Sequence, residues 1–225
     1  MDNILFVIPA RSGSQGIKNK NIMIWKNKPL IMHSYDFLLS KNISLSNICV
    51  STDSDHYINF LKNHGVDSRC LLKRPSCLAE NNVVDYPVIL HAWSLKEEQL
   101  KREFEFVAIV RPTSPIRPKD IISEGISSLQ KNKNLTSVRS MRKVSEHPFR
   151  LWKKGKIGYM VPIIENVFEP SNIPRQKLED KFYFQSGELE IIRRSTLQSG
   201  SISGSKVGII EISDKNIDID TPNDL

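Results

Sequence analysis

The sequence has few of the features that mark several large classes of protein. It contains only three cysteines, Cys49, Cys70 and Cys77, which form no CxxC pair and have no metal-ligand spacing with the five histidines. We therefore expect neither a disulfide framework nor a structural zinc site, but three buried or half-buried thiols in a reducing compartment. No apolar run approaches the ~20 residues that a membrane-spanning helix needs, and the first apolar segment has no basic region before it. These absences predict a cytoplasmic protein with no membrane partner.

The charge of the chain is basic, although its excess is not concentrated. Thirty-two lysines and arginines face 25 aspartates and glutamates, which gives a net charge of +7 in a chain of otherwise ordinary globular composition. Nucleic-acid-binding proteins usually gather such an excess on one stripe, whereas here the cations are spread along the chain, several beside Gly, Ser or Pro. The distribution favours small anionic ligands and no nucleic acid, with a basic nucleic-acid-binding domain as a third-ranked alternative.

Short apolar runs alternate with helical patterns over the first 140 residues. The apolar runs predict strands at residues 3–9, 47–52, 67–72, 105–110 and 135–140, with a further strand at 206–212. Helices are expected to begin at Pro29 and after a cap at Asp53 or Ser54, and to span residues 85–101 and 119–130. This alternation predicts βαβ units in a doubly wound, mostly parallel α/β sheet, with ligands bound beyond the carboxyl ends of the strands.

The regular alternation stops after about residue 144. Residues 145–185 are rich in proline, aromatic and charged residues and show no strong periodicity. We interpret this segment as an inserted arm. The predicted organisation is an α/β domain formed by residues 1–144 and 186–225, with the arm at 145–185.

Two segments have a composition suited to binding phosphates. The string IPARSGSQGIKNKN at residues 8–21 has small residues, which let backbone N–H groups approach an anion, together with Arg11, Lys18 and Lys20. In IDIDT at residues 217–221, alternation puts Asp218 and Asp220 on one face of an extended chain. Paired carboxylates beside a triphosphate offer the hard oxygen ligands that Mg²⁺ prefers.

The order of five motifs resembles that of the acylneuraminate cytidylyltransferases, the enzymes that make CMP-sialic acid and its bacterial relatives. The motifs are the two segments above, RPSCLA at 74–79, VRPTSPIR at 110–117, and the pair SEHPFR at 145–150 with PRQ at 174–176. The resemblance implies a Rossmann-like α/β fold and transfer of CMP from CTP to the anomeric hydroxyl of an acidic 2-keto sugar, with release of pyrophosphate. It also implies a Mg²⁺ cofactor and a homodimer in which the arm completes the sugar site of the partner.

The resemblance assigns roles to individual residues. Catalysis would rest on Arg11, Lys20 and Asp220, and Mg²⁺ on Asp218 and Asp220. The residues expected to bind the nucleotide are Ala10, Arg11, Ser14, Lys20, Asn21, Arg74 and Ala79, with Arg74 at the cytosine edge. The residues expected to bind the acceptor are Arg111, Thr113, Ser114, Arg150, Arg175, Gln176, Gln185, Ser186 and Glu190.

Departures from the family pattern lie mostly around the acceptor. Gln15 stands where the first loop usually has a lysine, and Arg111 where sialic acid enzymes often have glutamine. In QSGELEI, Ser186, Glu188 and Glu190 replace an asparagine, an alanine and a tyrosine. A buried unpaired carboxylate is costly. We therefore expect Glu190 to pair with a nearby arginine, first Arg111, or to meet an amino or hydroxyl group of the sugar.

These departures leave the acceptor open. The same chemistry on a deoxyoctulosonate, another nonulosonate or a phosphonate is one alternative, and a catalytically silent nucleotide-sugar-binding module is another. The base that deprotonates the sugar hydroxyl is also open, with a metal-bound hydroxide and an aspartate as candidates.

Overall fold

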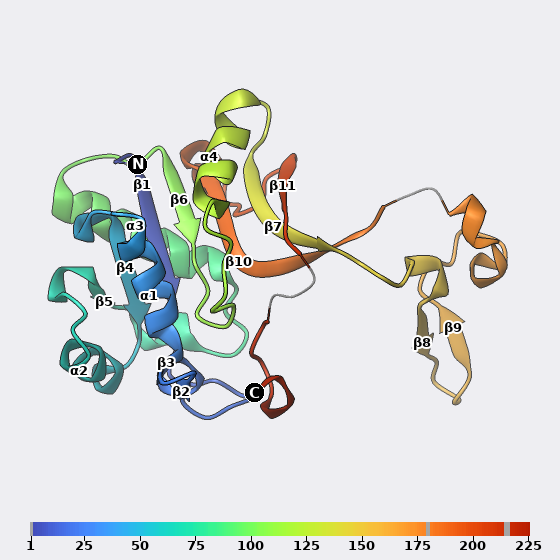
Figure 1. Cartoon of the computed structure of the whole chain (residues 1–225), viewed down its shortest axis with the longest axis horizontal. Helices are drawn as coiled ribbons and strands as arrows, with labels where there is room; N and C mark the ends of the chain where they lie inside the picture. Colours follow the sequence, from blue (N-terminus) through green and yellow to red (C-terminus); the bar gives the residue numbers. More distant parts are fainter. Residues whose placement is uncertain (1, 179–180, 214–216) are drawn as a thin grey trace.

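A seven-stranded mixed sheet forms the centre of the computed structural model, which describes residues 2–178, 181–213 and 217–225. Its strands lie in the order β11-β7-β10-β6-β1-β4-β5 (Figure 1). Their bounds are β1 Ile4–Pro9, β4 Ile48–Thr52, β5 Leu71–Lys73, β6 Phe106–Ile109, β7 Ser137–Lys143, β10 Tyr183–Arg193 and β11 Val207–Glu211. Within this sheet β10 is antiparallel to both of its neighbours, and the other strand pairs are parallel. The predicted doubly wound α/β architecture is confirmed.

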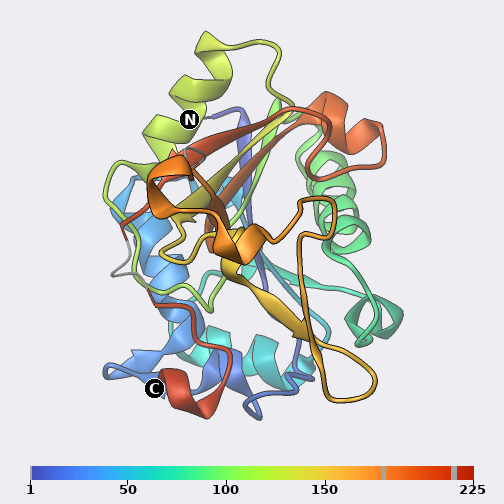
Figure 2. The same ribbon diagram turned by 90° about the vertical axis from the view of Figure 1, so that its right-hand side faces the viewer.

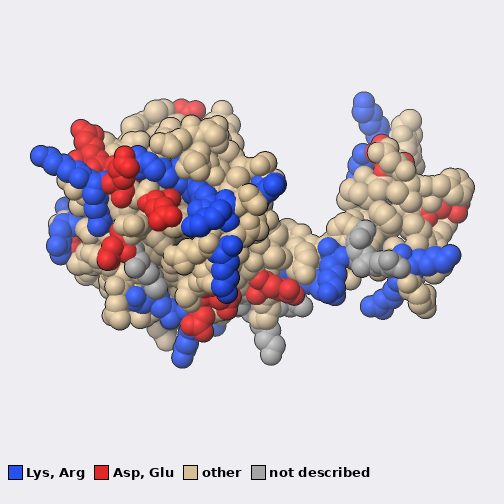
Figure 3. Space-filling model, turned by 90° about the horizontal axis from the view of Figure 1, so that it is seen from above, with Lys and Arg blue, Asp and Glu red and all other residues tan. Residues whose placement is uncertain are grey.

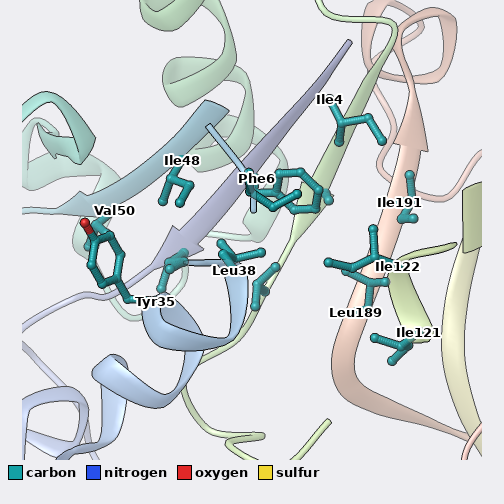
Figure 4. Packing of buried hydrophobic residues seen from close by; sticks show 14 of the residues in the cluster. Ile4, Phe6, Tyr35, Leu38, Ile48, Val50, Ile121, Ile122, Leu189 and Ile191 are labelled. Atoms are coloured by element: carbon teal, nitrogen blue, oxygen red, sulfur yellow. The ribbon is translucent and has the colours of Figure 1, made fainter. Parts of the chain in front are cut away.

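Helices cover both faces of the sheet because the buried strands are apolar on both sides. Even-numbered residues of β1, such as Phe6, belong to the core beneath the helices α1 (Leu30–Ser40), α2 (Asp55–Asn63) and α4 (Ile121–Lys131). Odd-numbered residues, such as Val7, pack on the side of α3 (Asp85–Leu100) and α5 (Arg194–Gln198). Figure 4 shows the first of these layers, where Phe6 of β1 lies close to Leu38 of α1. This double coverage explains the continuous apolar runs of the sequence.

Local signals set several boundaries as predicted. Pro29 directly precedes α1, and the Ser54 hydroxyl accepts a hydrogen bond from the Tyr57 N–H at 3.3 Å to cap α2. Asp53, the other candidate cap, instead accepts hydrogen bonds from Ser12. The first helical turn of α2 is thus closed by a serine, which leaves the aspartate for the neighbouring loop.

The third strand is shorter than predicted. Residues Ser68–Cys70 form a 3₁₀ turn, and β5 begins only at Leu71. The Asp67 carboxylate accepts the Arg69 N–H at 2.8 Å, and this local hydrogen bond stabilises a turn in place of a strand. The thiol prediction also needs correction at one position, because Cys77 is exposed while Cys49 and Cys70 are buried and free.

No strand was predicted for β10, which lies in the middle of the sheet between β6 and β7. Its residues 186–192 are buried although they include Glu188 and Glu190. The pairing of β10 with β7 shifts register between Gln185 and Glu190. This irregularity lies where the strand passes the end of β6, next to the candidate site described below.

Strands β7 and β10 extend away from the sheet and lead to a separate lobe, the arm (Figure 1), which Figure 2 views end-on in front of the body. Its hairpin consists of β8 (Trp152–Lys154) and β9 (Met160–Pro162). Figure 3 shows the arm joined to the body by a narrow connection. Among its apolar side chains, Ile157 is 87% and Phe168 is 89% exposed. Because the arm lies away from the core, no other part of the described chain buries these apolar residues.

Short elements complete the described chain. A second hairpin, β2 (Ile24–Trp25) and β3 (Lys28–Pro29), precedes α1. The 3₁₀ helices are η1 Lys20–Ile22, η2 Leu45–Asn47, η3 Ser68–Cys70, η4 Ser76–Ala79, η5 Pro148–Arg150, η6 Pro170–Asn172, η7 Arg175–Lys177 and η8 Pro222–Asp224. In the described ranges, no helix is both long and apolar enough to cross a membrane.

Candidate functional site

A cavity of about 460 Å³ opens at the carboxyl ends of the parallel strands. Its wall comes from the loops after β1, β5 and β6, from the start of α3 and from the C-terminal segment. The lining residues are Pro9, Arg11, Ser14, Gln15, Gly16, Lys20, Asn21, Arg74, Leu78, Glu80, Asn81, Val83, Asp85, Val88, Arg111, Pro112, Thr113 and Asp220. A cavity of this size and position is typical of a small-ligand site in a doubly wound sheet.

The loop after β1 is held from both sides. At its start, the Asp53 carboxylate accepts the Ser12 N–H at 2.9 Å and the Ser12 hydroxyl at 2.7 Å. Further along, the Asn21 amide donates to the Arg11 carbonyl at 3.0 Å. Burial opposes ionisation of Asp53, but the hydrogen bonds from Ser12 outweigh it and the pKa of the carboxyl lies below its usual value. The loop is therefore fixed by a charged group that sequence reasoning had assigned to a helix cap.

Gly16 lets this loop approach the C-terminal segment. A Cβ at Gly16 would lie 2.2 Å from the Asp220 carbonyl oxygen, so only glycine fits there. Close by, the Lys20 ammonium lies 2.6 Å from the Asp220 carboxylate. The close approach brings two segments 200 residues apart in the chain to the same end of the cavity.

Two arginines face the cavity without an ion-pair partner among the described residues. The Arg11 Nη1 donates only to neutral oxygens, the Glu80 carbonyl and the Asn81 Oδ1 at 3.2 Å. Arg74 is 4% exposed, and its Nε and Nη1 are buried without a hydrogen-bond partner. Burial lowers the pKa of Arg74, while the nearby carboxylates of Asp53 and Asp85 act in the opposite direction. Buried donors of this kind call for acceptors, which a ligand in the cavity can supply.

Arg111 follows β6 and is held by two carboxylates. Its Nη2 lies 2.7 Å from Asp85 Oδ2 and 2.6 Å from Glu190 Oε1. Glu190 is 1% exposed, and its other oxygen lies 2.9 Å from Arg139, without the geometry of a hydrogen bond. Burial alone would lower the pKa of Arg111, but Glu190 and Asp85 together raise it. The predicted pairing of Glu190 with Arg111 is confirmed.

Gln185 and Ser186, which were also predicted to bind the acceptor, lie next to this cluster. Arg139 donates to Gln185 Oε1 at 2.6 Å, and the Ser186 carbonyl accepts from the Ser140 hydroxyl at 3.2 Å. A Cβ at Gly187 would lie 2.4 Å from the Ser114 Oγ, so any other residue would displace the Ser114 hydroxyl where β10 passes the loop after β6. Gln185 and Ser186 do not line the cavity of the described chain.

The C-terminal segment lies against the loop after β6. The Ile219 N–H donates to the Thr113 carbonyl at 2.8 Å, and the Ser114 hydroxyl donates to Asp218 at 3.2 Å. Arg117 lies beneath them, where burial lowers its pKa to about 9 against the opposing effect of Glu188 and Asp218. These contacts fix the segment that carries both candidate metal ligands.

Asp218 and Asp220 fit a Mg²⁺ ion by the chemistry of their donor atoms. Both side chains are exposed, on either side of the buried Ile219. No cluster of three or more His, Cys, Asp or Glu suited to a metal occurs in the described ranges. Two carboxylates leave the other positions of an octahedral ion to phosphate and water, which is the usual arrangement for Mg²⁺ at a nucleotide.

The structure brings most of the predicted nucleotide residues to one place, but not the arm residues. Ala10, Ala79 and Ser114 adjoin lining residues without lining the cavity themselves, and Lys18 is exposed outside it. Arg150, Arg175 and Gln176 lie in the arm, away from the cavity of their own chain (Figure 1). Arg150 donates to the carbonyls of Ser171 and Ile173 within the arm.

Sequence reasoning missed several residues of the site. Asp53, Asp85 and Asn81 have no place in the recognised motifs, yet each contacts a residue that lines the cavity or adjoins one that does. The only available signal was position, because Asp53 and Asp85 each follow a strand or begin a helix at the carboxyl edge of the sheet.

Comparison with known proteins identifies relatives of this chain. N-acylneuraminate cytidylyltransferase of Escherichia coli O18:K1:H7 is 32% identical over 146 residues, which is 64% of this chain and 33% of that protein. CMP-N,N'-diacetyllegionaminic acid synthase of Legionella pneumophila is 27% identical over 229 residues, which is 98% of this chain and 92% of that protein. This chain thus spans about a third of the first relative and nearly all of the second.

A solved structure and a family model extend the comparison. A CMP:2-keto-3-deoxy-manno-octonic acid synthetase complexed with CTP aligns with a TM-score of 0.66 at 15% identity, over 98% of this chain and 94% of that one. At that identity the likeness shows a shared fold. The family model described as Cytidylyltransferase matches residues 5–174. The resemblance noted in the motifs is confirmed, and the chain belongs to the cytidylyltransferase family.

Proposed function

We propose that this protein transfers CMP from CTP to the anomeric hydroxyl of an acidic 2-keto sugar and releases pyrophosphate. The observation that carries the proposal is the convergence of Arg11, Lys20 and Arg74 on one cavity. Cations at one end suit a triphosphate, and a buried guanidinium with unsatisfied donors suits the O2 and N3 acceptors of cytosine. The activities named for the relatives support the same reaction class.

The residues of the chain would contribute positioning and charge neutralisation. The sugar hydroxyl gives its proton to a base as its oxygen attacks the α-phosphorus of CTP. A new phosphorus–oxygen bond forms, the bond from the α-phosphorus to the bridging oxygen breaks, and pyrophosphate leaves with that oxygen. Arg11 and Lys20 would stabilise the charge that develops on the leaving pyrophosphate. The rigid loop after β1 would hold the phosphates in line for attack, because Asp53 and Asn21 fix its backbone.

Asp218 and Asp220 would hold Mg²⁺. When bound, the ion supplies charge neutralisation at the phosphate oxygens. The Lys20 ammonium forms an ion pair with the Asp220 carboxylate in this structure. It would move to the phosphates when nucleotide and metal bind together. We place the reaction in the cytoplasm, in line with the free cysteines and the absence of a membrane-spanning helix in the described ranges.

A panel of acceptors tests the function. Pyrophosphate release from CTP should depend on an acidic 2-keto sugar, and the panel should contain N-acetylneuraminate, an amino-substituted nonulosonate, a deoxyoctulosonate and a phosphonate. Because Glu190 is already paired with Arg111 and Arg139, it does not disfavour N-acetylneuraminate. CTP binding without turnover of any acid would instead indicate a silent binding module.

We also propose a homodimer in which the arm of one copy completes the acceptor site of the other. The arm exposes Ile157 and Phe168, and the side chain of its Arg175 has no hydrogen-bond or ion-pair partner among the described residues. Two inactive variants test this arrangement. Lys20→Ala and Arg175→Ala should each be inactive alone, while a refolded mixture should regain about a quarter of wild-type sites, because half of the dimers pair one intact cavity with one intact arm. A mixture that stays inactive would contradict the shared site, because each arm would then serve only the cavity of its own chain.

A further inference from the structure

Asp85 lines the cavity, and no motif of the family explains it. It is the first residue of α3, and its side chain is 37% exposed. One carboxylate oxygen, Oδ2, lies 2.7 Å from Arg111. The other oxygen, Oδ1, accepts no hydrogen bond from the described residues. The cavity therefore contains a carboxylate oxygen that is free to accept a hydrogen bond from a ligand.

Asp85 lies at the carboxyl edge of the sheet, where it lines the cavity at the start of α3. Helix α3 connects β5 to β6 and crosses the sheet over β4 and β1, so its first residue lies between the carboxyl ends of the two strands that it joins. Arg74 follows β5 on one side, and Arg111 follows β6 on the other. Asp85 contacts Arg111 directly and is close enough to favour the charged form of Arg74.

The next step rests on the proposed function. With cytosine at Arg74 and the phosphates at Arg11 and Lys20, the ribose lies between them, in the cavity that Asp85 also lines. Arg11 and Asp85 are both close enough to Arg74 to act on its charge. A vicinal diol donates hydrogen bonds, and carboxylates at the carboxyl edge of nucleotide-binding sheets commonly accept them. The ion pair with Arg111 offsets the charge of Asp85, so that the carboxylate can stand near a polyanion without strong repulsion.

We propose that Asp85 accepts a hydrogen bond from the 2′-hydroxyl of CTP and so makes the enzyme select ribonucleotides over deoxyribonucleotides. Asp85 is then a specificity-determining residue for the nucleotide. Two other roles are compatible with its position. It could orient Arg111 only, or it could contact the acceptor sugar. Each of these predicts a different kinetic result.

The test compares CTP with dCTP as donors at a fixed acceptor concentration. Wild type should prefer CTP in kcat/KM by at least about tenfold, because dCTP leaves the carboxylate oxygen unsatisfied. Asp85→Ala should reduce the preference to about twofold, chiefly by slowing CTP, and Asp85→Asn should lie between the two. Asp36→Asn is the matched control. Asp36 lies on α1, outside the cavity, where its side chain is 42% exposed and forms an ion pair with Lys28.

Three outcomes would overturn the inference. Equal losses for CTP and dCTP in Asp85→Ala would mean that Asp85 only orients Arg111. A rise in the KM of the acceptor with an unchanged donor preference would move Asp85 to the acceptor site. A wild type that uses CTP and dCTP equally would show that the 2′-hydroxyl is not read at all.

Calorimetric binding of CTP and dCTP without acceptor separates this inference from the proposed function. Tighter binding of CTP that is lost in Asp85→Ala supports the inference even if no acid is turned over, in which case only the proposed reaction fails. Turnover without discrimination overturns the inference and leaves the reaction standing. A wild type that binds neither nucleotide overturns both.

Discussion

The two halves of the site treat charge in opposite ways. In the nucleotide half, formed by residues 10–21 and 74–81, Arg11 and Arg74 face the cavity without an ion-pair partner in the described chain. In the acceptor half, formed by residues 111–117 and 185–190, Arg111 is already bound to two carboxylates. One half is prepared to receive a polyanion, whereas the other is neutralised before any ligand arrives.

This difference explains which departures from the family pattern are tolerated. Glu190 would be prohibitively costly alone in the sheet, but Arg111 and Arg139 surround it, so the cluster behaves as a rigid and nearly neutral unit. A neutral acceptor half cannot by itself grip the carboxylate of a sugar acid. We propose that the arm of a second copy supplies the cation for that carboxylate.

The largest effect that we expect is a loss of turnover on substitution of Asp220, in the nucleotide half. Asp220→Asn removes one charged oxygen from the proposed Mg²⁺ site, and we expect at least a ~10²-fold loss of turnover. The measurement is pyrophosphate release as a function of Mg²⁺ concentration. Thermal unfolding should be nearly unchanged, because Asp220 is exposed. Near-normal Mg²⁺-supported rates would remove Asp220 from the metal site.

Removal of Arg74 tests the base-reading end of the same half. Arg74→Ala should weaken CTP binding by roughly 1–3 kcal/mol, since the acceptors of cytosine lose a buried partner. Calorimetry should show an unchanged affinity for inorganic triphosphate. Arg69→Ala, at an exposed arginine paired with Asp67, is the control. If both variants bind CTP as wild type does, cytosine lies elsewhere.

A double-mutant cycle sharpens the description of the acceptor half. Arg111→Gln and Glu190→Gln should each lower the free energy of unfolding, and the double variant should lose less than the sum. We expect a coupling energy of about 1 kcal/mol or more, as for other buried and directly bonded pairs. Urea unfolding of the four proteins gives this value. Strict additivity would mean that the ion pair of 2.6 Å contributes nothing to stability.

The smallest effect concerns the pH dependence of the loop anchor. Burial opposes ionisation of Asp53, but the hydrogen bonds from Ser12 hold the pKa of Asp53 below its usual value. The anchor therefore contributes stability above pH ~4 and loses it as the pH falls through the folded pKa. Asp53→Asn should cost about 1 kcal/mol at pH 7, a modest figure because the group is partly exposed. The gap to wild type should narrow as the pH falls through the folded pKa of Asp53. Asp120→Asn, at an exposed aspartate, should show no such gap.

The fold was largely predictable because its parallel strands are short, continuous apolar runs. β1, β4 and β6 satisfy this pattern, and so do the helices between them. β10 does not, because Glu188 and Glu190 interrupt its apolar pattern. Their burial depends on arginines from β7 and from the loop after β6, and no local pattern in the sequence reports such distant partners.

The parts of the site that lie within the sequence motifs were predictable. The loop after β1 and the residues around Arg74 both reach the cavity. Asp53 and Asp85 were not predictable, since an aspartate at the start of a helix is as common for capping as for binding. Their roles depend on Ser12 and Arg111, which become neighbours only when the sheet forms.

Following the α-phosphorus of CTP by ³¹P NMR tests the proposed reaction most directly. With Mg²⁺ and an acidic 2-keto sugar, the α-phosphorus signal should move to that of a CMP phosphodiester, and pyrophosphate should appear in equal amount. Without the sugar, the spectrum of CTP should stay unchanged. Conversion of CTP to free CMP in the absence of a sugar, or an unchanged spectrum with every acid of the panel, would contradict transfer to an acidic sugar.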